Sequence, residues 1–566
     1  MANKIIIYQM LPRLFGNTTT NCVEGGTIAQ NGCGKFNDIT RKALHTIHNL
    51  GATHVWYTGI LEHTTRTDYT QYGIESTHPA TVKGEAGSPY AIKDYYDVDP
   101  DLAVDVPNRR KEFIALIERT HKEGMKVIMD FIPNHVARHY KSDNRPAGTY
   151  DFGQNDDKSA FFLGHNNFYY LGEQDYGCNI DAKESAAERY SESPLRATGN
   201  DCFGAPSRND WYDTVKLNYG IDYRTGNRQF CPVPDTWVKM LKILKYWASQ
   251  GVDGFRCDMV EMTPVEFWNW ALPKVKEEYP HLIFIGEIYQ PHIYRSFINE
   301  GHFDYLYDKV GLYDTLRAVM NGCASANDIT YTLQSTSDIR QNMLTFLENH
   351  DEQRIASDFF ASKAERALAA LIVSTTIDSQ PFMLYAGEEL GERGMDKEGY
   401  SGVDGRTTIF DYWSVDTLRR RCNNGKYDKE LLTDEEISLQ KFHRHLLTLC
   451  NINEALREGR FYDLQYANPY SDNYDNNRIY SYLRGTDNEL LLIVANFCDS
   501  NRICKVNIPR EAYAYFSREA SNNSIKTSDL LSGKELDITL SADEPIELEI
   551  PANSGVIIPI KIQEVI

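Results

Sequence analysis

Short apolar runs rich in β-branched and aromatic residues recur along the first two thirds of the chain, separated by amphipathic segments. The eight runs lie near residues 5, 53, 126, 252, 282, 303, 344 and 381. Runs of this kind are typical of buried strands, and strands that alternate with helices form a parallel sheet. About eight such units predict a closed (β/α)8 TIM barrel, with a doubly wound open sheet as the alternative.

Two of the intervening segments carry helix start and stop signals. Residues 107–124 have Pro107 in the first turn and Gly124 as the stop. Residues 234–251 offer Asp235 as an N-cap and Gly251 as a terminator. We expect both segments to be helices that cover the sheet.

Two further segments interrupt the alternation. Residues 136–216 are rich in Asn, Asp, Gly and Tyr without a clear strand and helix unit, which predicts an inserted subdomain after strand three. A helix with a capping box at Thr433 and Glu436 follows much later, and beyond it short strands alternate with turn residues. The expected domains are a barrel of residues 1–135 and 217–454, an insert of residues 136–216, and a C-terminal β-sandwich of residues 455–566.

Composition excludes several classes of protein. A net charge of -21 argues against nucleic acid or an anionic membrane surface as a partner. No apolar run reaches membrane-spanning length, and the start lacks the pattern of a signal peptide, so we expect a cytoplasmic protein without a membrane partner. The 11 cysteines form no CxxC pair, which favours free thiols, with a Cys22–Cys33 bridge as the alternative.

Charged residues stand where the apolar runs end. They are Asp130, the pair Arg256 and Asp258, Glu287, and the pair His350 and Asp351. In a TIM barrel these ends share one rim, where chemistry takes place. A structural ion pair would explain Arg256 together with Asp258. It would leave the other acids as a cluster of like charges, which destabilises a fold unless the cluster has a function. Cys257 faces away from Asp258 and should be a buried thiol.

Cleavage of a glycosidic bond needs two carboxyl groups on either side of that bond. One donates a proton to the leaving oxygen, and the other attacks the sugar or activates water. An arginine beside the attacking carboxylate favours its ionised form by charge and hydrogen bonding. We therefore expect Arg256 to keep Asp258 an anion that can act as a nucleophile.

Four short motifs carry a family resemblance. DFIPNH, GFRCD, GE and ENHD, in this order at the strand ends, resemble the motifs of the α-amylase family of glycoside hydrolases, family 13. The resemblance covers nearly the whole chain, and KLNYG at residues 216–220 is similar to a fifth motif. It implies an enzyme of starch and maltooligosaccharide metabolism that needs no cofactor for its chemistry.

The resemblance also implies roles for individual residues. Asp258 would be the nucleophile, Glu287 the general acid/base, and Asp351 the acid that distorts and stabilises the sugar. The residues implied to contact substrate are His135, Arg256, His350 and the stacking platform Tyr90. Taken singly, Tyr90 is interpreted equally well as a core residue, and each histidine is more often a core group than a ligand. Asp130 is interpreted as a structural hydrogen-bond partner rather than a substrate contact, and the Glu388–Glu389 pair as structural.

One position departs from the family pattern. Many α-amylases have Lys-His at the third and fourth positions after the nucleophile, which help to bind the sugar chain and a structural calcium. Glu261 and Met262 stand there in this chain. Asn134 remains a candidate calcium ligand, and Asp175 and Asp181 in the insert are further oxygen donors.

Three functions are compatible with these motifs. The first is a retaining α-glucan hydrolase that acts through a covalent glycosyl-enzyme, with α-glucan as its partner. The second is a transglycosylase that uses the same residues and passes the sugar to another sugar. The third is a non-catalytic barrel that binds glucan or a protein, which the presence of all three carboxylates disfavours.

Overall fold

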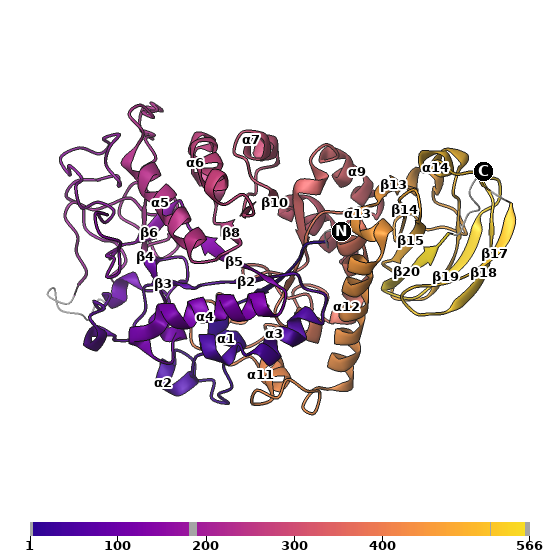
Figure 1. The fold of residues 1–566 in the computed structure, drawn as a ribbon, viewed down its shortest axis with the longest axis horizontal. Coiled ribbons are helices and arrows are strands. Elements are labelled where there is room, and N and C mark those ends of the chain that lie inside the picture. Colours follow the sequence, from indigo (N-terminus) through magenta and orange to yellow (C-terminus); the bar gives the residue numbers. More distant parts are fainter. Residues whose placement is uncertain (1–3, 180–188, 521, 561–566) are drawn as a thin grey trace.

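The computed structural model describes residues 4–179, 189–520 and 522–560. Figure 1 shows a large body centred on a barrel and a smaller lobe of strands, drawn in yellow, at one end. The long helix α12 (Asp434–Ile452) lies between the two. Within the described residues no helix combines the length and apolar character that crossing a membrane requires.

Eight parallel strands close into a barrel in the spatial order β1, β12, β11, β10, β9, β8, β5, β2. The strands are β1 (Ile6–Met10), β2 (His54–Tyr57), β5 (Lys126–Phe131), β8 (Gly254–Cys257), β9 (Ile283–Gly286), β10 (Tyr305–Tyr307), β11 (Met343–Phe346) and β12 (Phe382–Tyr385). Each coincides with one of the eight apolar runs. The prediction of a TIM barrel is confirmed, and the open doubly wound sheet is excluded.

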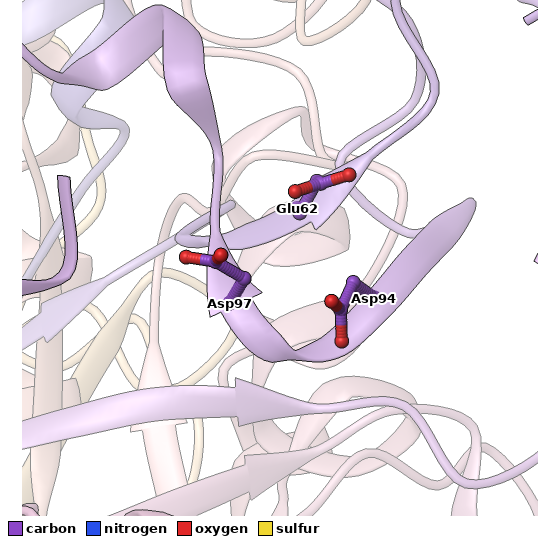
Figure 2. A group of neighbouring side chains, drawn as sticks. All are labelled: Glu62, Asp94 and Asp97. Atoms are coloured by element: carbon purple, nitrogen blue, oxygen red, sulfur yellow. The ribbon is translucent and has the colours of Figure 1, made fainter. Parts of the chain in front are cut away.

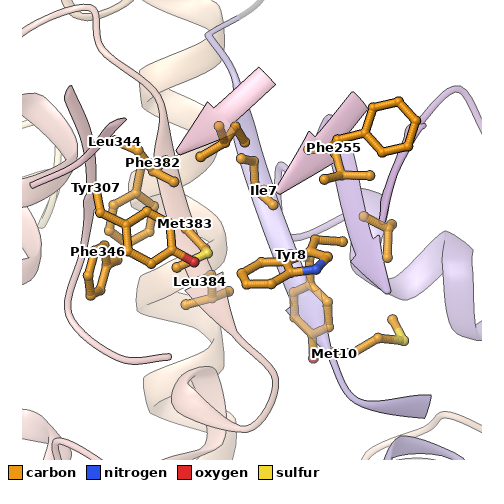
Figure 3. Close-up of a cluster of buried hydrophobic side chains, with 14 of the residues drawn as sticks. Ile7, Tyr8, Met10, Phe255, Tyr307, Leu344, Phe346, Phe382, Met383 and Leu384 are labelled. Carbon is orange, nitrogen blue, oxygen red and sulfur yellow. The ribbon is translucent and has the colours of Figure 1, made fainter. Parts of the chain in front are cut away.

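The strands are buried on both faces because helices cover the outside and packed side chains fill the inside. Figure 3 shows part of this core, with labelled side chains from β1, β8, β10, β11 and β12. Ile7, Phe382 and Leu384 are at most 1% exposed. Burying a side chain of this size stabilises the fold by about 1.5–3 kcal/mol, so the core fixes the strand ends firmly.

Fourteen α-helices are present in the described residues. They are α1 (Pro12–Phe15), α2 (Ile28–Asn31), α3 (Arg41–His48), α4 (Arg109–Lys122), α5 (Asp235–Ser249), α6 (Val265–Glu278), α7 (Tyr294–Asn299), α8 (Asp314–Met320), α9 (Asn327–Ser335), α10 (Leu368–Thr376), α11 (Asp416–Cys422), α12, α13 (Glu454–Glu458) and α14 (Arg510–Tyr515). The capping box predicted at Thr433 and Glu436 begins α12.

The two predicted helices exist, but their starts were placed wrongly. The N-cap of α5 is Pro234, and Asp235 is the first helical residue, where its charge favours the positive helix end. Pro107 lies in a separate 3-10 turn, and α4 begins at Arg109. Proline sets its own φ but does not decide whether the residues after it continue as one helix.

The segment between β5 and α5 has little regular structure. Its described residues include one antiparallel strand pair, β6 (His135–Ala137) with β7 (Thr214–Lys216). A small core of its own contains Tyr169, Leu195 and Tyr212. These features agree with an insert, while the boundaries 136–216 stay a prediction.

The C-terminal lobe consists of antiparallel strands. They are β13 (Arg460–Asp463), β14 (Ile479–Gly485), β15 (Leu490–Asn496), β16 (Arg502–Val506), β17 (Asn523–Ser528), β18 (Glu535–Leu540), β19 (Ile546–Ile550) and β20 (Ser554–Pro559). β13, β14, β15 and β20 form one sheet, and the pairs β16–β19 and β17–β18 close a hydrophobic core with it. Helix α10 of the barrel packs against β15 and β20. The predicted C-terminal β-sandwich is confirmed.

All eleven cysteines lie within the described residues and are free thiols. The alternative of a Cys22–Cys33 bridge is therefore wrong. The Cys22 thiol contacts the carbonyl of Ser414, and the Cys33 thiol contacts that of Asp101. Cys257 is fully buried, as predicted.

Candidate active site

Three carboxylates from neighbouring parts of the barrel rim meet at one cavity. Asp258 directly follows β8, Glu287 directly follows β9, and Asp351 lies in the loop after β11. Because the strands are parallel, these ends lie at the same edge of the barrel. The cavity has a volume of about 330 Å³, and Tyr90 and His135 also line it. The structure thus brings together five of the seven residues that were predicted to be catalytic or to bind substrate.

The backbone holds Asp258 and Glu287 side by side. The Asp258 amide donates to the carbonyl of Phe131, and the Glu287 amide donates to the carbonyl of Cys257, both over 2.9 Å. Strand pairing therefore extends to Asp258 and Glu287. Met259 turns the chain immediately afterwards with a φ of 42°, a left-handed conformation that strains an ordinary residue by about 1–2 kcal/mol.

Arg256 contacts both carboxylates and does not itself line the cavity. Its Nη1 donates to Asp258 Oδ1 over 2.8 Å, and its Nη2 forms an ion pair with Glu287 Oε2 at 2.7 Å. Asp130 Oδ1 lies 3.8 Å from Nη1. The guanidinium is 1% exposed and is surrounded by the rings of Trp56, Tyr90 and Tyr307. One buried cation therefore lies beside three acids, so Arg256 and Asp258 do not form an isolated ion pair.

The pKa values of the two carboxyl groups are set by burial and charge together. Burial raises the pKa of Asp258 above its ordinary value, and Arg256 counteracts that rise. Burial and the charges of Asp258 and Asp351 raise the pKa of Glu287 to about 7, against the lowering effect of Arg256. The expected influence of Arg256 on Asp258 is present, but burial outweighs it.

Asp351 has a different electrostatic environment. Burial by itself would raise its pKa, but the imidazole of His350 and the charge of Arg256 bring the pKa below the ordinary value. His350 Nε2 lies 3.1 Å from Asp351 Oδ2 and 2.5 Å from the hydroxyl of Tyr90. The other ring nitrogen, Nδ1, contacts Gln9 Nε2 over 2.7 Å. His350 is therefore held in place from both sides.

His135 and Asp130 occupy different positions at this rim. Burial lowers the pKa of His135 to about 3, so its imidazole is neutral where it lines the cavity beside Trp211. Asp130 Oδ2 accepts a hydrogen bond from the Gly59 amide over 3.0 Å, and Asp130 does not line the cavity. This contact agrees with the structural reading of Asp130.

Comparison with known proteins gives the family. The sequence model of the alpha-amylase catalytic domain matches residues 9–431, which is well over half of the 566 residues. This chain belongs to the alpha-amylase family.

Individual relatives of the alpha-amylase family are distant. An alpha-amylase of Streptomyces lividans is 25% identical over 469 residues, covering 75% of this chain and 47% of that protein. A cyclomaltodextrinase of a Bacillus species is 22% identical over 508 residues, covering 87% of this chain and 72% of that protein. The native debranching enzyme of Nostoc punctiforme has a TM-score of 0.64 at 17% identity, covers 99% of this chain and 100% of its own, and shows the shared fold. The chain spans about half the length of curated relatives such as the Streptomyces protein.

The chain departs from the pattern of many α-amylases in the segment just after Asp258. Glu261 Oε2 accepts a hydrogen bond from the Tyr289 amide over 2.9 Å, and Met262 Sδ lies 3.5 Å from Asn134 Nδ2. Glu261 does not line the cavity. Glu261 therefore contacts the backbone of the loop after β9 rather than the cavity.

The surroundings of Asn134 do not fit a calcium ligand. Its Oδ1 accepts a hydrogen bond from the Lys216 ammonium over 2.8 Å, and Nδ2 donates to the Gly199 carbonyl over 2.7 Å. Lys216 also pairs with Asp201 at 2.5 Å. A protein cation thus lies at the oxygen that a calcium ion would need. Asp175 is exposed, and Asp181 lies outside the described residues.

One acidic cluster in the described residues has oxygens close enough to share a metal ion. Figure 2 shows it: Glu62 on β3 (Leu61–His63) with Asp94 and Asp97 on β4 (Ile92–Val98). Two basic side chains already serve this cluster. Arg109 pairs with Asp97 at 2.7 Å, and Lys93 lies 3.5 Å from Glu62. We assign no metal to it because this charge balance is that of a buried ion-pair network.

Several cavity residues were not foreseen from the sequence. They are Lys83, Trp211, Asp213, Tyr289, Tyr400 and Arg406. All except Tyr289 come from long irregular segments, where no periodic pattern or motif marks a position as facing the site. Tyr289 stands two residues after Glu287, and its closeness to that motif is the one signal that could have indicated it.

Proposed function

We propose that this chain is a retaining hydrolase of α-glucans in which Asp258 is the nucleophile and Glu287 the general acid/base. One observation carries the proposal: Asp258 and Glu287 line the same cavity while a single guanidinium, that of Arg256, contacts both. Retaining glycosidases need two carboxyl groups close together, because one must attack the carbon whose leaving oxygen the other protonates.

In the first step the glycosidic bond breaks. The proton of Glu287 passes to the leaving oxygen, and Asp258 forms a bond to the anomeric carbon. The released sugar departs with the proton, and the remaining sugar is an ester of Asp258. In the second step the Glu287 carboxylate takes a proton from water, the water oxygen attacks the same carbon, and Asp258 leaves as a carboxylate.

The electrostatics of the site support this division of roles. A pKa of about 7 leaves Glu287 protonated in a large fraction of molecules near neutral pH, as an acid catalyst requires. Arg256 donates directly to Asp258, which favours the anion that attacks. The pKa of Asp351 is held low, so its carboxylate can stabilise positive charge on the sugar ring in the transition state.

The cavity and the relatives support an α-glucan as substrate. Tyr90, Trp211, Tyr289, Tyr400 and Phe410 line the cavity, and aromatic rings with polar edges suit the mixed apolar and hydroxylated faces of sugars. The relatives named alpha-amylase and cyclomaltodextrinase support the same class. The site residues supply the proposed acid, base and nucleophile, so no cofactor takes part in these steps.

A product profile tests this function. The protein is incubated with starch, pullulan, a cyclodextrin, isomaltose and short maltooligosaccharides, and reducing ends are measured. We expect release from at least one α-glucan, with the α-anomer appearing first in proton NMR spectra. A first product in the β-configuration would refute retention, and binding without release from any glucan would favour a non-catalytic barrel.

The same experiment with an added acceptor sugar separates hydrolysis from transfer. A hydrolase gives mainly free sugars whether or not the acceptor is present. Elongated products as the main outcome would show that a sugar resolves the intermediate, and would replace hydrolysis with transglycosylation on the same residues.

A further inference from the structure

We propose that Tyr289 is a positioning residue for Glu287. Its hydroxyl holds Oε1, the oxygen that carries the catalytic proton, and Glu261 fixes the position of Tyr289. The inference rests on the proposed function, because it assigns a task to the proton of Glu287. It goes beyond that function by naming the reactive oxygen and two further residues.

The two oxygens of Glu287 have different partners. Oε2 accepts a hydrogen bond from the Met259 amide over 2.9 Å and lies 2.7 Å from the Arg256 Nη2. A proton on Oε2 would point toward two donors, one of them charged, which is electrostatically unfavourable. The neutral acid therefore places its proton on Oε1.

Oε1 faces a partner that suits both protonation states. The Tyr289 hydroxyl donates to Oε1 over 2.7 Å, and Tyr289 lines the cavity. A tyrosine hydroxyl can donate to a carboxylate and accept from a carboxylic acid. The same contact can thus hold Glu287 before and after proton transfer. Burial and the neighbouring Glu287 charge keep the hydroxyl itself protonated by raising the pKa of Tyr289 far above its ordinary value.

Glu261 explains how Tyr289 is held. Glu261 lies in the 3-10 turn Val260–Met262, and its Oε2 accepts a hydrogen bond from the Tyr289 amide over 2.9 Å. The Val260 amide donates to the Glu287 carbonyl over 3.0 Å in the same region. Two contacts therefore tie the loop after β8 to the loop after β9. The glutamate that replaces the family lysine acts on the loop geometry and not on the sugar.

Other groups also interact electrostatically with Glu287, and they are unchanged in the variants of Tyr289 and Glu261. They come from the end of β8, from β10 and from the loops after β11 and β12: Arg256, Asp258, Tyr307, Asp351 and Tyr400. Among the described residues, none of these groups forms a hydrogen bond with Oε1, whereas Tyr289 does. A change confined to Tyr289 therefore isolates the contact at this oxygen.

The main test is Tyr289→Phe, which removes the hydroxyl and keeps the ring. Loss of a donor to the ionised form raises the pKa of Glu287, so the alkaline limb of kcat/KM moves up by about 0.5–1 pH unit. Tyr331→Phe is the control, because Tyr331 is 66% exposed and lies outside the cavity, and it leaves the profile unchanged. A residue with a merely structural role would alter the rate without moving the limb.

Two variants of Glu261 test the anchor. Glu261→Gln keeps a carbonyl oxygen that can accept from the Tyr289 amide, and its profile should match the wild type. Glu261→Leu removes the acceptor and should move the alkaline limb in the same direction as Tyr289→Phe. Equal profiles for Leu and Gln would overturn the role of Glu261.

A second readout separates this inference from the proposed function. Carbon-13 NMR titration follows the carboxyl of Glu287 directly, with its signal assigned by Glu287→Gln, and requires no turnover. An upward shift in Tyr289→Phe without activity on any glucan would sustain the contact and reject the function. Activity with an unchanged limb and titration in Tyr289→Phe would reject the inference and leave the function standing.

Discussion

Replacing Arg256 by methionine tests the electrostatic design of the site most sharply. Arg256 is 1% exposed and contacts Asp258 and Glu287 at 2.8 and 2.7 Å. Methionine occupies part of the same volume but supplies neither charge nor donors. The variant therefore leaves two buried carboxyl groups without their shared counter-ion.

Removing one partner of a buried ion pair destabilises a protein by about 3–5 kcal/mol. For the 9–431 region, an unfolding entropy of about 2.1 cal/mol/K per residue amounts to about 0.9 kcal/mol/K. The expected fall in unfolding temperature is therefore about 3–6 °C at a pH where both carboxyls of the wild type are ionised.

The stability that Arg256→Met loses should depend on pH. The pKa of Glu287 is raised from 4.5 to about 7 in the folded protein. A raised carboxyl pKa contributes stability that is present below the unfolded value and is lost as pH rises through the folded value, here about 3 kcal/mol. Without Arg256 the pKa of Glu287 rises further, so the stability of the variant continues to fall at higher pH than that of the wild type. The difference between variant and wild type is small near about pH 5 and large near about pH 8.

Calorimetry at these two pH values measures the effect. Arg484→Met is the matched control, because Arg484 is fully buried and donates to the carbonyl oxygens of Thr376, Leu456 and Gly459 rather than to acids. Its destabilisation should change little with pH. An Arg256→Met variant with the same loss at both pH values would refute the reasoning.

Three further predictions concern activity, metal binding and helix capping. Asp258→Asn should lower the rate on the best α-glucan by at least about 1,000-fold, as loss of a nucleophile requires, while Asp358→Asn at an exposed position leaves the rate unchanged. A variant at Asp258 that kept wild-type turnover would exclude it as the nucleophile. Addition of EDTA should leave the unfolding temperature unchanged, because the Lys216 ammonium already lies at Asn134; a fall that calcium reverses would contradict this. Thr433→Ala should destabilise the protein by about 1 kcal/mol through loss of the α12 cap, measured by chemical denaturation, whereas Thr433→Ser should stay within a few tenths of the wild type.

The barrel could be predicted because its strands are buried on both faces. Such strands appear in sequence as short continuous apolar runs, and all eight runs became strands. Helix starts were harder, as Asp235 shows: an N-cap and a first-turn acid are the same residue type one position apart. Local sequence does not decide between them, because both positions favour a negative charge.

The candidate site was predictable only where it is attached to strands. Asp258 and Glu287 continue the strand pairing, so a correct strand assignment places them. Lys83, Asp213 and Arg406 reach the cavity from irregular segments, and their positions depend on tertiary packing. The partner of Asn134 was missed for the same reason, since Lys216 is 82 residues later in the sequence and comes beside Asn134 only through the pairing of β6 with β7.

Trapping the proposed intermediate tests the central claim most directly. Glu287→Gln is incubated with a maltosyl fluoride, whose fluoride leaves without an acid, so the glycosyl group can still be transferred while its release is slowed. Mass spectrometry of the digested protein should find the added maltosyl group on the peptide that contains Asp258, and no adduct when Asp258→Asn is combined with Glu287→Gln. An adduct on a different residue, or rapid turnover with inversion and no adduct, would contradict the account.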